Sequence, residues 1–429
     1  MSALDALKKR IETAQFARVH GRLKAVNGPL LRAALPGARM GTRARVGGVR
    51  CEVVGISGSD CDLLPLDAID GLTVGAPVTL EYGRLRIPVG PGLIGRIVDP
   101  MGEPIDGGPP ITGVRVPVHA NAPDPLTRPA IDTPLWTNIR VLDGLLTLGR
   151  GQRMAILAGS GVGKSTLLGM LASQVACDVN VICLVGERGR EVREFIDDVL
   201  GPEGLARSVV VVATSDTSPG LQVKAPLVAT AIAEAFRSLG QHVLLMMDSL
   251  TRLALAQRQI GLAAGEPPAT RGFPPSVFGM LPTLLERAGT SASGGSITGI
   301  YTVLVEGDDI HDPIGDAVRG IADGHIVLSR DLANAGHYPA IDALGSVSRV
   351  MNRVVDRDHL EASRRLRGLM ATWAENEELV RLGAYTKGAS AEIDRAIQRQ
   401  PAVRAFLRQT SEESTSPDVT RKALALLGS

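Results

Sequence analysis

The sequence predicts an α/β core built on a mostly parallel sheet, preceded by a small β-barrel and followed by a helical domain. Short β segments punctuated by Gly, Asn and Asp fill the region from Val19 to about Pro88, which is typical of a small closed barrel. Apolar runs then alternate with helical patterns from Gly149 to about Val350, which predicts a parallel sheet with helices on both faces. After Asp356 the chain becomes charged and helical. We therefore expect four parts: residues 1–18, 19–88, 89–355 and 356–429.

The bulk composition sets few limits on function. The 429 residues allow two or three domains, and 44% apolar with 21% charged residues is ordinary for a globular protein. The net charge of +1 gives no global argument for a nucleic-acid or membrane partner. Charge is uneven, however, because residues 1–50 hold eleven Lys and Arg against Asp5 and Glu12. This excess fits an acidic partner, an anionic lipid surface or a solvated basic face.

The cysteines and the apolar runs indicate the compartment. Four cysteines show no paired metal-ligand spacing, and one of them, Cys183, lies within an apolar run. We expect free thiols and no disulfides, as in a reducing compartment. No secretory signal is recognised and no apolar run approaches membrane-spanning length. The sequence thus predicts a cytoplasmic protein, with peripheral membrane contact left open.

Residues 1–18 have the pattern of a short basic amphipathic helix. Its apolar and basic positions are Leu4, Leu7, Ile11 and Ala14, and Lys8, Lys9 and Arg10. The apolar stripe fits packing on its own domain, docking to a partner, or contact with a membrane surface.

The barrel strands are expected at residues 21–26, 43–46, 51–56, 62–65 and 78–85. Barrels of this kind often bind single-stranded nucleic acid by stacking bases on aromatic side chains. Phe16 and Tyr82 are the only aromatic residues before residue 90, so we expect no nucleic-acid partner.

The core follows a Pro- and Gly-rich segment, residues 88–134. Its strands are expected at residues 153–158, 179–185, 208–213, 242–247, 297–305 and 324–328. Pro226 is expected to interrupt the start of the helix that follows Val223. In the helical tail, the polar stretch from Thr410 to Asp418 is expected to be a loop.

A phosphate-binding loop is predicted where the first core strand meets a helix. It consists of Ala158, Gly159, Ser160, Gly161, Val162, Gly163, Lys164, Ser165 and Thr166. The glycines let backbone N–H groups turn inward, and the following helix points its positive end at the same place. Lys164 would reach the β- and γ-phosphates of a nucleotide, and the Ser165 hydroxyl would hold Mg²⁺. Ala158 stands where this motif usually begins with Gly, and the alternative is a chance glycine-rich turn.

Two carboxylates end buried strands and are expected at the same edge of the sheet. Asp248 would orient Mg²⁺ through water, or else cap the helix that follows it. Glu187 would polarise a water that attacks the γ-phosphate. The alternative for Glu187 is a surface ion pair with Arg188 or Arg190.

The motifs together resemble the catalytic subunits of rotary ATP synthases, and more closely the export ATPases of type III secretion, above all the flagellum-specific ones. The resemblance covers nearly the whole chain, and this family also carries Ala at the position of Ala158. The stretches that carry it begin at Ala158, Gly186, Asp248, Gly265, Gly295, Tyr301, Asp323, Pro339 and Gly383.

The resemblance implies a RecA-like ATPase core and a homohexameric ring whose ATP sites are shared between neighbours. Carried over residue by residue, Glu187 is the catalytic base, and Arg188 joins it among the catalytic residues. Arg349 is the arginine finger that reaches the neighbouring γ-phosphate, and Tyr338 packs against adenine. A loop with Asp308, Asp309 and Asp312 matches one that faces the central stalk in rotary relatives, or is simply a solvated acidic turn.

The function implied is ATP hydrolysis that energises protein export through the flagellar type III apparatus. Implied partners are a stator protein at the N-terminal helix, a central coiled-coil stalk protein, export chaperones with their substrates, and the export gate at the inner membrane, where acidic lipid contact is open. An injectisome ATPase is the alternative, although the stretch from Asp309 to Gly320 favours the flagellar branch. An RNA translocase is disfavoured by the aromatic-poor barrel, and an inactive ring subunit by the presence of Glu187, Lys164 and Arg349.

Overall fold

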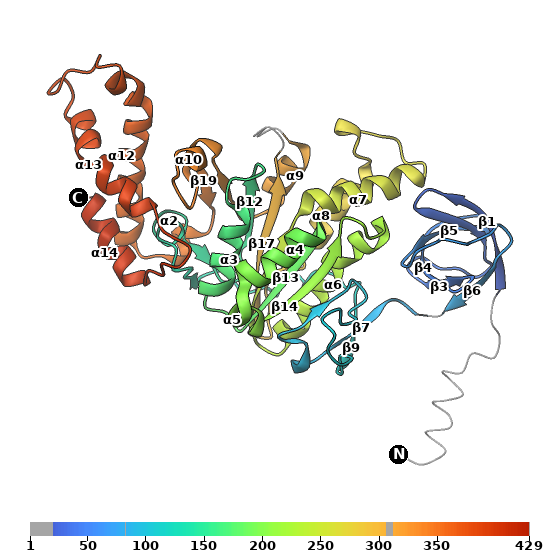
Figure 1. Ribbon diagram of the computed structural model, residues 1–429. Coiled ribbons are helices and arrows are strands. Elements are labelled where there is room, and N and C mark those ends of the chain that lie inside the picture. The colour runs from blue at the N-terminus through green and yellow to red at the C-terminus, as the bar shows by residue number, and fades with distance from the viewer. Residues whose placement is uncertain (1–19, 82, 306–311, 429) are drawn as a thin grey trace, which may run out of the picture.

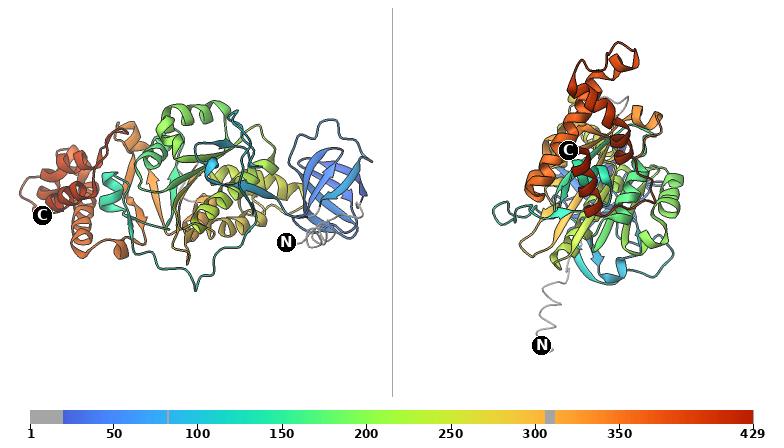
Figure 2. Two further views of the ribbon diagram at one scale, coloured as in Figure 1. Left: turned by 90° about the horizontal axis from the view of Figure 1, so that it is seen from below. Right: turned by 90° about the vertical axis from the view of Figure 1, so that its left-hand side faces the viewer.

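The computed structural model describes residues 20–81, 83–305 and 312–428, and its three parts lie in a row (Figures 1 and 2). The barrel occupies one end, the parallel sheet the middle, and the C-terminal helices the other end. The helix expected at residues 1–18, together with Tyr82, Asp308 and Asp309, lies outside the described residues. The fold class is confirmed, whereas the domain limits at 18/19, 88/89 and 355/356 stay predictions.

The N-terminal barrel is closed, as predicted, by six antiparallel strands in the order β1-β2-β5-β4-β3-β6. Their bounds are β1 His20–Asn27, β2 Leu30–Ala34, β3 Arg43–Val46, β4 Val49–Ser57, β5 Asp60–Pro65 and β6 Pro77–Glu81. Alternate side chains such as Leu31, Val53 and Leu63 fill its interior. Strand β2 was not expected. Strand β6 ends at Glu81, whereas the prediction ran on to residue 85.

The basic residues of the barrel are paired across its strands. Lys24 contacts Asp60 at 2.5 Å, and Arg32 contacts Asp62 at 3.1 Å. Arg45–Glu81 and Arg50–Asp67 make similar pairs at 3.0 and 2.6 Å. Acidic residues later in the sequence therefore neutralise much of the local excess that residues 20–50 show in isolation.

The segment between barrel and core is ordered around a two-stranded sheet and one edge strand. Strand β7 (Arg86–Val89) pairs with β9 (Val114–Pro117), and β8 (Ile97–Val98) joins the edge of the central sheet.

The central sheet has nine strands, with the main order β19-β18-β12-β17-β15-β13-β14-β8. The strands of its centre are β12 Arg153–Ala158, β13 Val179–Glu187, β14 Ser208–Thr214, β15 His242–Asp248, β17 Ser296–Leu304 and β18 Gly324–Leu328. Neighbours among them are parallel, as predicted, while β19 (Ile341–Ser348) and β16 (Gly289–Thr290) pair antiparallel with β18 and β17. The strands are nearly continuous apolar runs because helices cover both faces.

The helices divide into two sets that bury the two faces of the sheet. One hydrophobic cluster packs α6 (Pro219–Ser238), α7 (Leu250–Ala263), α8 (Pro275–Leu285) and α9 (Pro313–Ile321) against it. The other packs α2 (Arg140–Leu145) and α3 (Lys164–Gln174). The predicted interruption at Pro226 is wrong, because α6 runs through it. Packing of α6 over four strands of the central sheet, β13, β14, β15 and β17, outweighs the roughly 3 kcal/mol that an interior proline costs.

The C-terminal part is helical, as predicted, with α12 (Arg357–Arg381), α13 (Ala391–Leu407) and α14 (Pro417–Gly428). The loop expected from Thr410 to Asp418 is present but ends at Ser416, because α14 begins at Pro417. Arg140 on α2 anchors these helices by donating to the carbonyl of Phe406 at 2.9 Å. The Trp136 ring stacks on the His359 ring at 6.3 Å between centroids.

The remaining general predictions concern cysteines and membrane spans. All four cysteines are free, as expected. Within the described ranges, no helix combines the length and apolar character needed to cross a membrane.

Candidate active site

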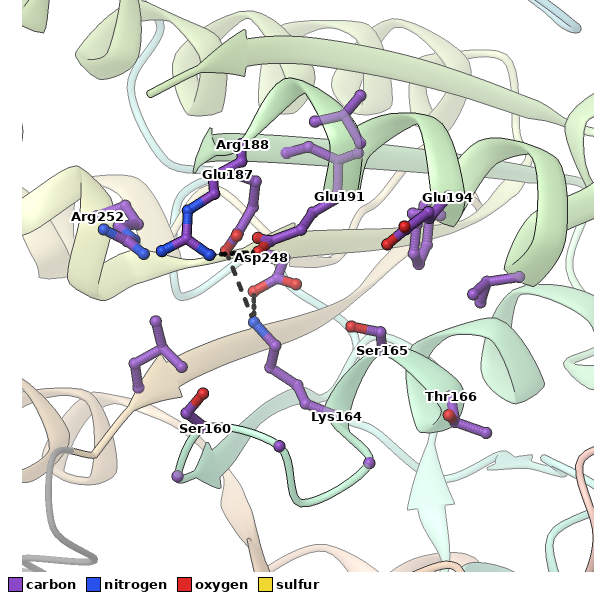
Figure 3. Close-up of a pocket in the computed structure, with 18 residues that line it drawn as sticks. Ser160, Lys164, Ser165, Thr166, Glu187, Arg188, Glu191, Glu194, Asp248 and Arg252 are labelled. Atoms are coloured by element: carbon purple, nitrogen blue, oxygen red, sulfur yellow. Dashed lines mark hydrogen bonds and ion pairs between the residues drawn. The ribbon is translucent and has the colours of Figure 1, made fainter. Parts of the chain in front are cut away.

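A cavity of about 430 Å³ opens at the carboxyl ends of β12, β13 and β15, over the predicted phosphate-binding loop (Figure 3). The loop leaves β12 after Ala158 and enters α3 at Lys164. Gly161 and Gly163 have φ of +76° and +92°, a left-handed conformation that a side chain would strain. The loop thus takes the strand–turn–helix form that directs backbone N–H groups and the helix N-terminus at a phosphate.

Lys164 joins the loop to the two strand-end carboxylates. Its Nζ lies 2.5 Å from Asp248 Oδ1 and 3.8 Å from Glu187 Oε1. Figure 3 shows the three side chains converging above the loop, with Ser165 and Thr166 beside them on α3. The start of α3 and the ends of two strands therefore bring one lysine and two carboxyl groups together at the cavity.

Asp248 is not the cap of the helix that follows it. Ser249 fills that role, since its hydroxyl accepts from the backbone N–H of Arg252 at 3.4 Å. The Asp248 carboxylate instead accepts from Lys164 Nζ and, at 2.7 Å, from the hydroxyl of Thr302 on β17. The carboxylate is thereby held at the cavity, where it is available to a metal-bound water.

Glu187 is prepared to act as a base near neutral pH. Burial, reinforced by the charge of Asp248, raises its pKa to about 7, although Lys164 opposes the shift. Its Oε1 is buried and accepts no hydrogen bond. The surface ion-pair alternative does not describe it, because Arg188 pairs with Glu191 at 2.8 Å and Arg190 with Glu194 at 3.6 Å.

The residues around the cavity fit a magnesium ion. The Ser165 hydroxyl and the Asp248 carboxylate are hard oxygen donors, the type that Mg²⁺ prefers, and Glu187 Oε1 beside them accepts no hydrogen bond. Among the described residues no cluster of three or more His, Cys, Asp or Glu forms a complete protein site for a metal.

Tyr338 lies beside the loop. Its ring packs so closely over Gly163 that a Cβ on this glycine would lie 3.3 Å from the ring. Tyr338 is nevertheless 45% exposed. The backbone carbonyl of Tyr338 accepts from the N–H of Gln409 at 2.9 Å, so the loop before α14 supports this edge of the site. The position suits contact with a nucleotide base, and the role itself stays a prediction.

Arg349 does not reach the cavity of its own chain. Its exposed guanidinium donates to the carbonyls of Arg319 at 3.1 Å and Ala322 at 3.2 Å, where α9 ends. Of the other predicted residues, Gly159, Ser160, Gly161, Gly163, Lys164, Ser165, Thr166, Glu187, Arg188 and Asp248 line the cavity, whereas Ala158 and Val162 are buried behind it.

Sequence reasoning missed three residues that contribute to the site. Arg252 lines it from α7, four residues after Asp248, and Glu191 lines it four residues after Glu187. Each lies in the first turn of the helix that follows a strand-end carboxylate, and that position was the available signal. Thr302 contacts Asp248 from behind. The sequence distinguishes Thr302 only as a hydroxyl residue within an apolar strand.

Comparisons with known proteins agree with this geometry. Residues 138–348 match the nucleotide-binding domain of the ATP synthase alpha/beta family, and residues 355–425 match the C-terminal domain of the type III secretion ATPase EscN. The type 3 secretion system ATPase of Xanthomonas euvesicatoria is 52% identical over 97% of this chain and 96% of its own length. The flagellum-specific ATP synthase of Bacillus subtilis (strain 168) is 48% identical over 98% of this chain and 97% of its own.

Solved structures give the same result. The assembled ATPase EscN of enteropathogenic E. coli superimposes with a TM-score of 0.92 at 44% identity, over 95% of this chain and 100% of that one. EscN in complex with its central stalk EscO superimposes with a TM-score of 0.88 over the same shares of the two chains.

Proposed function

Since the chain belongs to the family of flagellar and type III secretion ATPases and is an ATP-hydrolysing enzyme, we propose that its hydrolysis energises protein export through a flagellar type III apparatus. Hydrolysis would drive the unfolding or delivery of export substrates at the cytosolic face of the export gate. The observation that carries the mechanism is the half-buried Glu187, whose pKa is raised to about 7, beside the lysine of the phosphate-binding loop.

Each residue has a defined task in the proposed reaction. Lys164 would turn from Asp248 to the phosphates, and Ser165 and Asp248 would hold Mg²⁺, whose charge would offset that of the phosphate oxygens. Glu187, once ionised, orients and deprotonates the attacking water. Arg188 lines the same cavity and would stabilise charge near the γ-phosphate.

The proposed finger, Arg349, lies outside the cavity of its own chain, which supports a ring. Arg349 is exposed and lies away from its own cavity, as expected of a finger that enters a neighbour's site. We propose a homohexamer in which each ATP lies between Glu187 of one subunit and Arg349 of the next. The assembled state of EscN supports this oligomer, and its complex with EscO supports a coiled-coil stalk as partner.

The other proposed partners rest on the family resemblance. They are a stator protein that binds residues 1–18, chaperones with their substrates, and the export gate, with acidic lipid as an additional contact of the basic terminus. The protein would then be cytoplasmic and peripheral to the inner membrane.

Substitution of the base tests the reaction. Glu187→Gln removes the group that accepts the proton while keeping its shape, and should lower turnover by about 10²–10⁴-fold. Equilibrium binding of a fluorescent ATP analogue should be retained. Turnover at the wild-type rate would show that Glu187 is not the base. Hydrolysis that requires added RNA would instead favour an RNA translocase.

The choice between flagellar and injectisome export needs a cellular test. Relatives of both kinds are similar to this chain, and the stretch that begins at Asp309 favours the flagellar branch. Deleting the gene from its source organism should abolish filaments and swimming. Retained swimming together with loss of secreted virulence-type proteins would identify the injectisome instead.

A further inference from the structure

Thr302 is a buried hydroxyl placed directly behind the catalytic cavity. It lies on β17, which is hydrogen-bonded to β12 on one side and to β15 on the other. These two strands carry the phosphate-binding loop and Asp248. The side chain is 0% exposed, and its strand neighbours Tyr301 and Val303 are equally buried. A polar group in such a place is retained only when its hydrogen bond contributes to stability or function.

The hydroxyl has two acceptors within reach but only one proton to donate. Thr302 Oγ1 lies 2.7 Å from Asp248 Oδ1 and 3.2 Å from the carbonyl oxygen of Met247. The carboxylate is charged and nearer, so it is the stronger acceptor. Lys164 Nζ approaches the same Oδ1 at 2.5 Å. Both donors therefore use one oxygen of Asp248 and leave Oδ2 to the cavity.

Nucleotide binding changes this balance, because Lys164 is then needed at the phosphates. Its departure removes one of the two donors from Asp248 Oδ1. Thr302 stays, since it is fixed in the centre of the sheet and does not face the nucleotide.

We propose that Thr302 is a positioning residue that holds Asp248 for Mg²⁺ after Lys164 has moved to the phosphates, an inference that rests on the proposed ATPase mechanism. The hydroxyl fixes Oδ1, so that Oδ2 faces the water ligands of the ion. Without it, Asp248 turns its second oxygen out of line. This weakens the Mg²⁺-bound nucleotide complex and leaves the metal-free complex, in which Lys164 still reaches the phosphates, little changed.

The test compares ATP-analogue affinity in EDTA with affinity in Mg²⁺. Thr302→Val keeps the shape and removes the donor. In EDTA, Thr302→Val should bind the ATP analogue with wild-type affinity. The factor by which Mg²⁺ increases that affinity, the Mg²⁺ gain, should be smaller than in the wild type by about tenfold or more, the size associated with a hydrogen bond to a charged group. Thr302→Ser restores the hydroxyl and should restore most of that gain. The concentration of Mg²⁺ for half-maximal hydrolysis should rise in Thr302→Val by a similar factor.

Thr298→Val is the matched control on the same strand. Thr298 is also buried, and its hydroxyl accepts from the backbone N–H of Gly151 at 2.9 Å, at the opposite end of β17 from Asp248. This variant loses a buried hydrogen bond of the strand but not the one to Asp248, and it should keep the wild-type Mg²⁺ gain. Should Thr302→Val fail to fold, the smaller Thr302→Ala serves in its place.

The proposal is overturned if Thr302→Val retains the full Mg²⁺ gain, or if Thr298→Val loses the same amount. Neither result concerns how the wild-type enzyme hydrolyses ATP, so the proposed ATPase mechanism survives both. Failure of that mechanism shows itself differently, as wild-type turnover after Glu187→Gln.

Discussion

Glu187 and Asp248 confine two negative charges beside a single lysine, and this crowding sets how the enzyme responds to pH. Burial and the Asp248 charge favour the neutral form of Glu187 and raise its pKa to about 7, while a hydrogen bond with Glu191 adds to the shift. A base must be ionised to accept a proton. Activity should therefore be low below pH 7 and should rise as the pH passes through that value.

This response can be measured as the pH dependence of kcat/KM, which reports on groups of the free enzyme. Its acid limb should have an apparent pKa near 7. Glu191→Gln replaces a carboxyl neighbour with a neutral amide that donates a hydrogen bond, which favours ionised Glu187 and should move the limb to lower pH. Glu194→Gln, another change at the cavity wall, should leave the limb in place. A limb near pH 4 in the wild type would contradict the assignment.

At the scale of elements, a buried ion pair fastens the barrel to the core. Lys224 on α6 lies 2.6 Å from Glu52 on β4, and His119 Nε2 lies 3.0 Å from the same lysine. Both residues are less than 5% exposed. Burial alone would raise the pKa of Glu52, but His119 and Lys224 outweigh it and hold that pKa below its ordinary value.

Removing one partner of this pair leaves a buried charge uncompensated. Lys224→Met should lower the free energy of unfolding by about 3–5 kcal/mol, measured by chemical denaturation. Adding Glu52→Gln should recover part of the loss, since no bare charge then remains. Lys24→Met breaks the exposed pair with Asp60 and should lower the free energy of unfolding far less, because solvent screens that pair. Equal losses of unfolding free energy in the two lysine variants would show that the buried pair stabilises the protein no more than the exposed one.

The same pair gives the junction a defined pH dependence. Because the pKa of Glu52 is lower in the folded protein, its contribution to stability is complete above the ordinary glutamate pKa of about 4.3. The contribution is lost as the pH falls from there through the folded value. Wild-type stability should therefore decline in this acid range more steeply than that of the Lys224→Met, Glu52→Gln double variant, as followed by thermal unfolding at successive pH values.

Elements with a strong local pattern were predictable, and those defined by distant partners were not. The limits of β3, β12 and β18 agree with the sequence prediction residue for residue. Strand β2, Leu-Leu-Arg-Ala-Ala, has no β-branched residue and no clear alternation, so it was missed. Pro226 was misjudged because local propensity does not include the packing that keeps α6 continuous.

The site was predictable as far as its motifs extend. Strand ends and the glycine-rich turn identify Lys164, Asp248 and Glu187, because parallel strands bring their carboxyl ends to one edge. The sequence does not show that Thr302 donates to Asp248, since this contact depends on the register of β15 and β17. The Lys224–Glu52 pair joins residues 172 positions apart and has no local signal at all.

At the scale of the whole molecule, the position of Arg349 bears on how many chains would make one site. This proposed finger lies at the end of α9, outside the cavity that holds Lys164, Glu187 and Asp248. Arg349→Ala should therefore reduce turnover by about 10³-fold or more while leaving nucleotide binding by the isolated chain unchanged. Turnover per subunit should also rise steeply with protein concentration in the wild type, because isolated chains lack a finger.

The shared site is tested most directly by mixing two inactive variants, Glu187→Gln and Arg349→Ala. In a mixed ring, a site is complete when the pocket comes from an Arg349→Ala subunit and the finger from a Glu187→Gln neighbour. Random assembly at equal amounts makes about one quarter of the sites complete, so the mixture should hydrolyse ATP although neither variant does alone. A mixture that stays inactive, when differently tagged subunits co-purify in one ring, would contradict a site shared between chains.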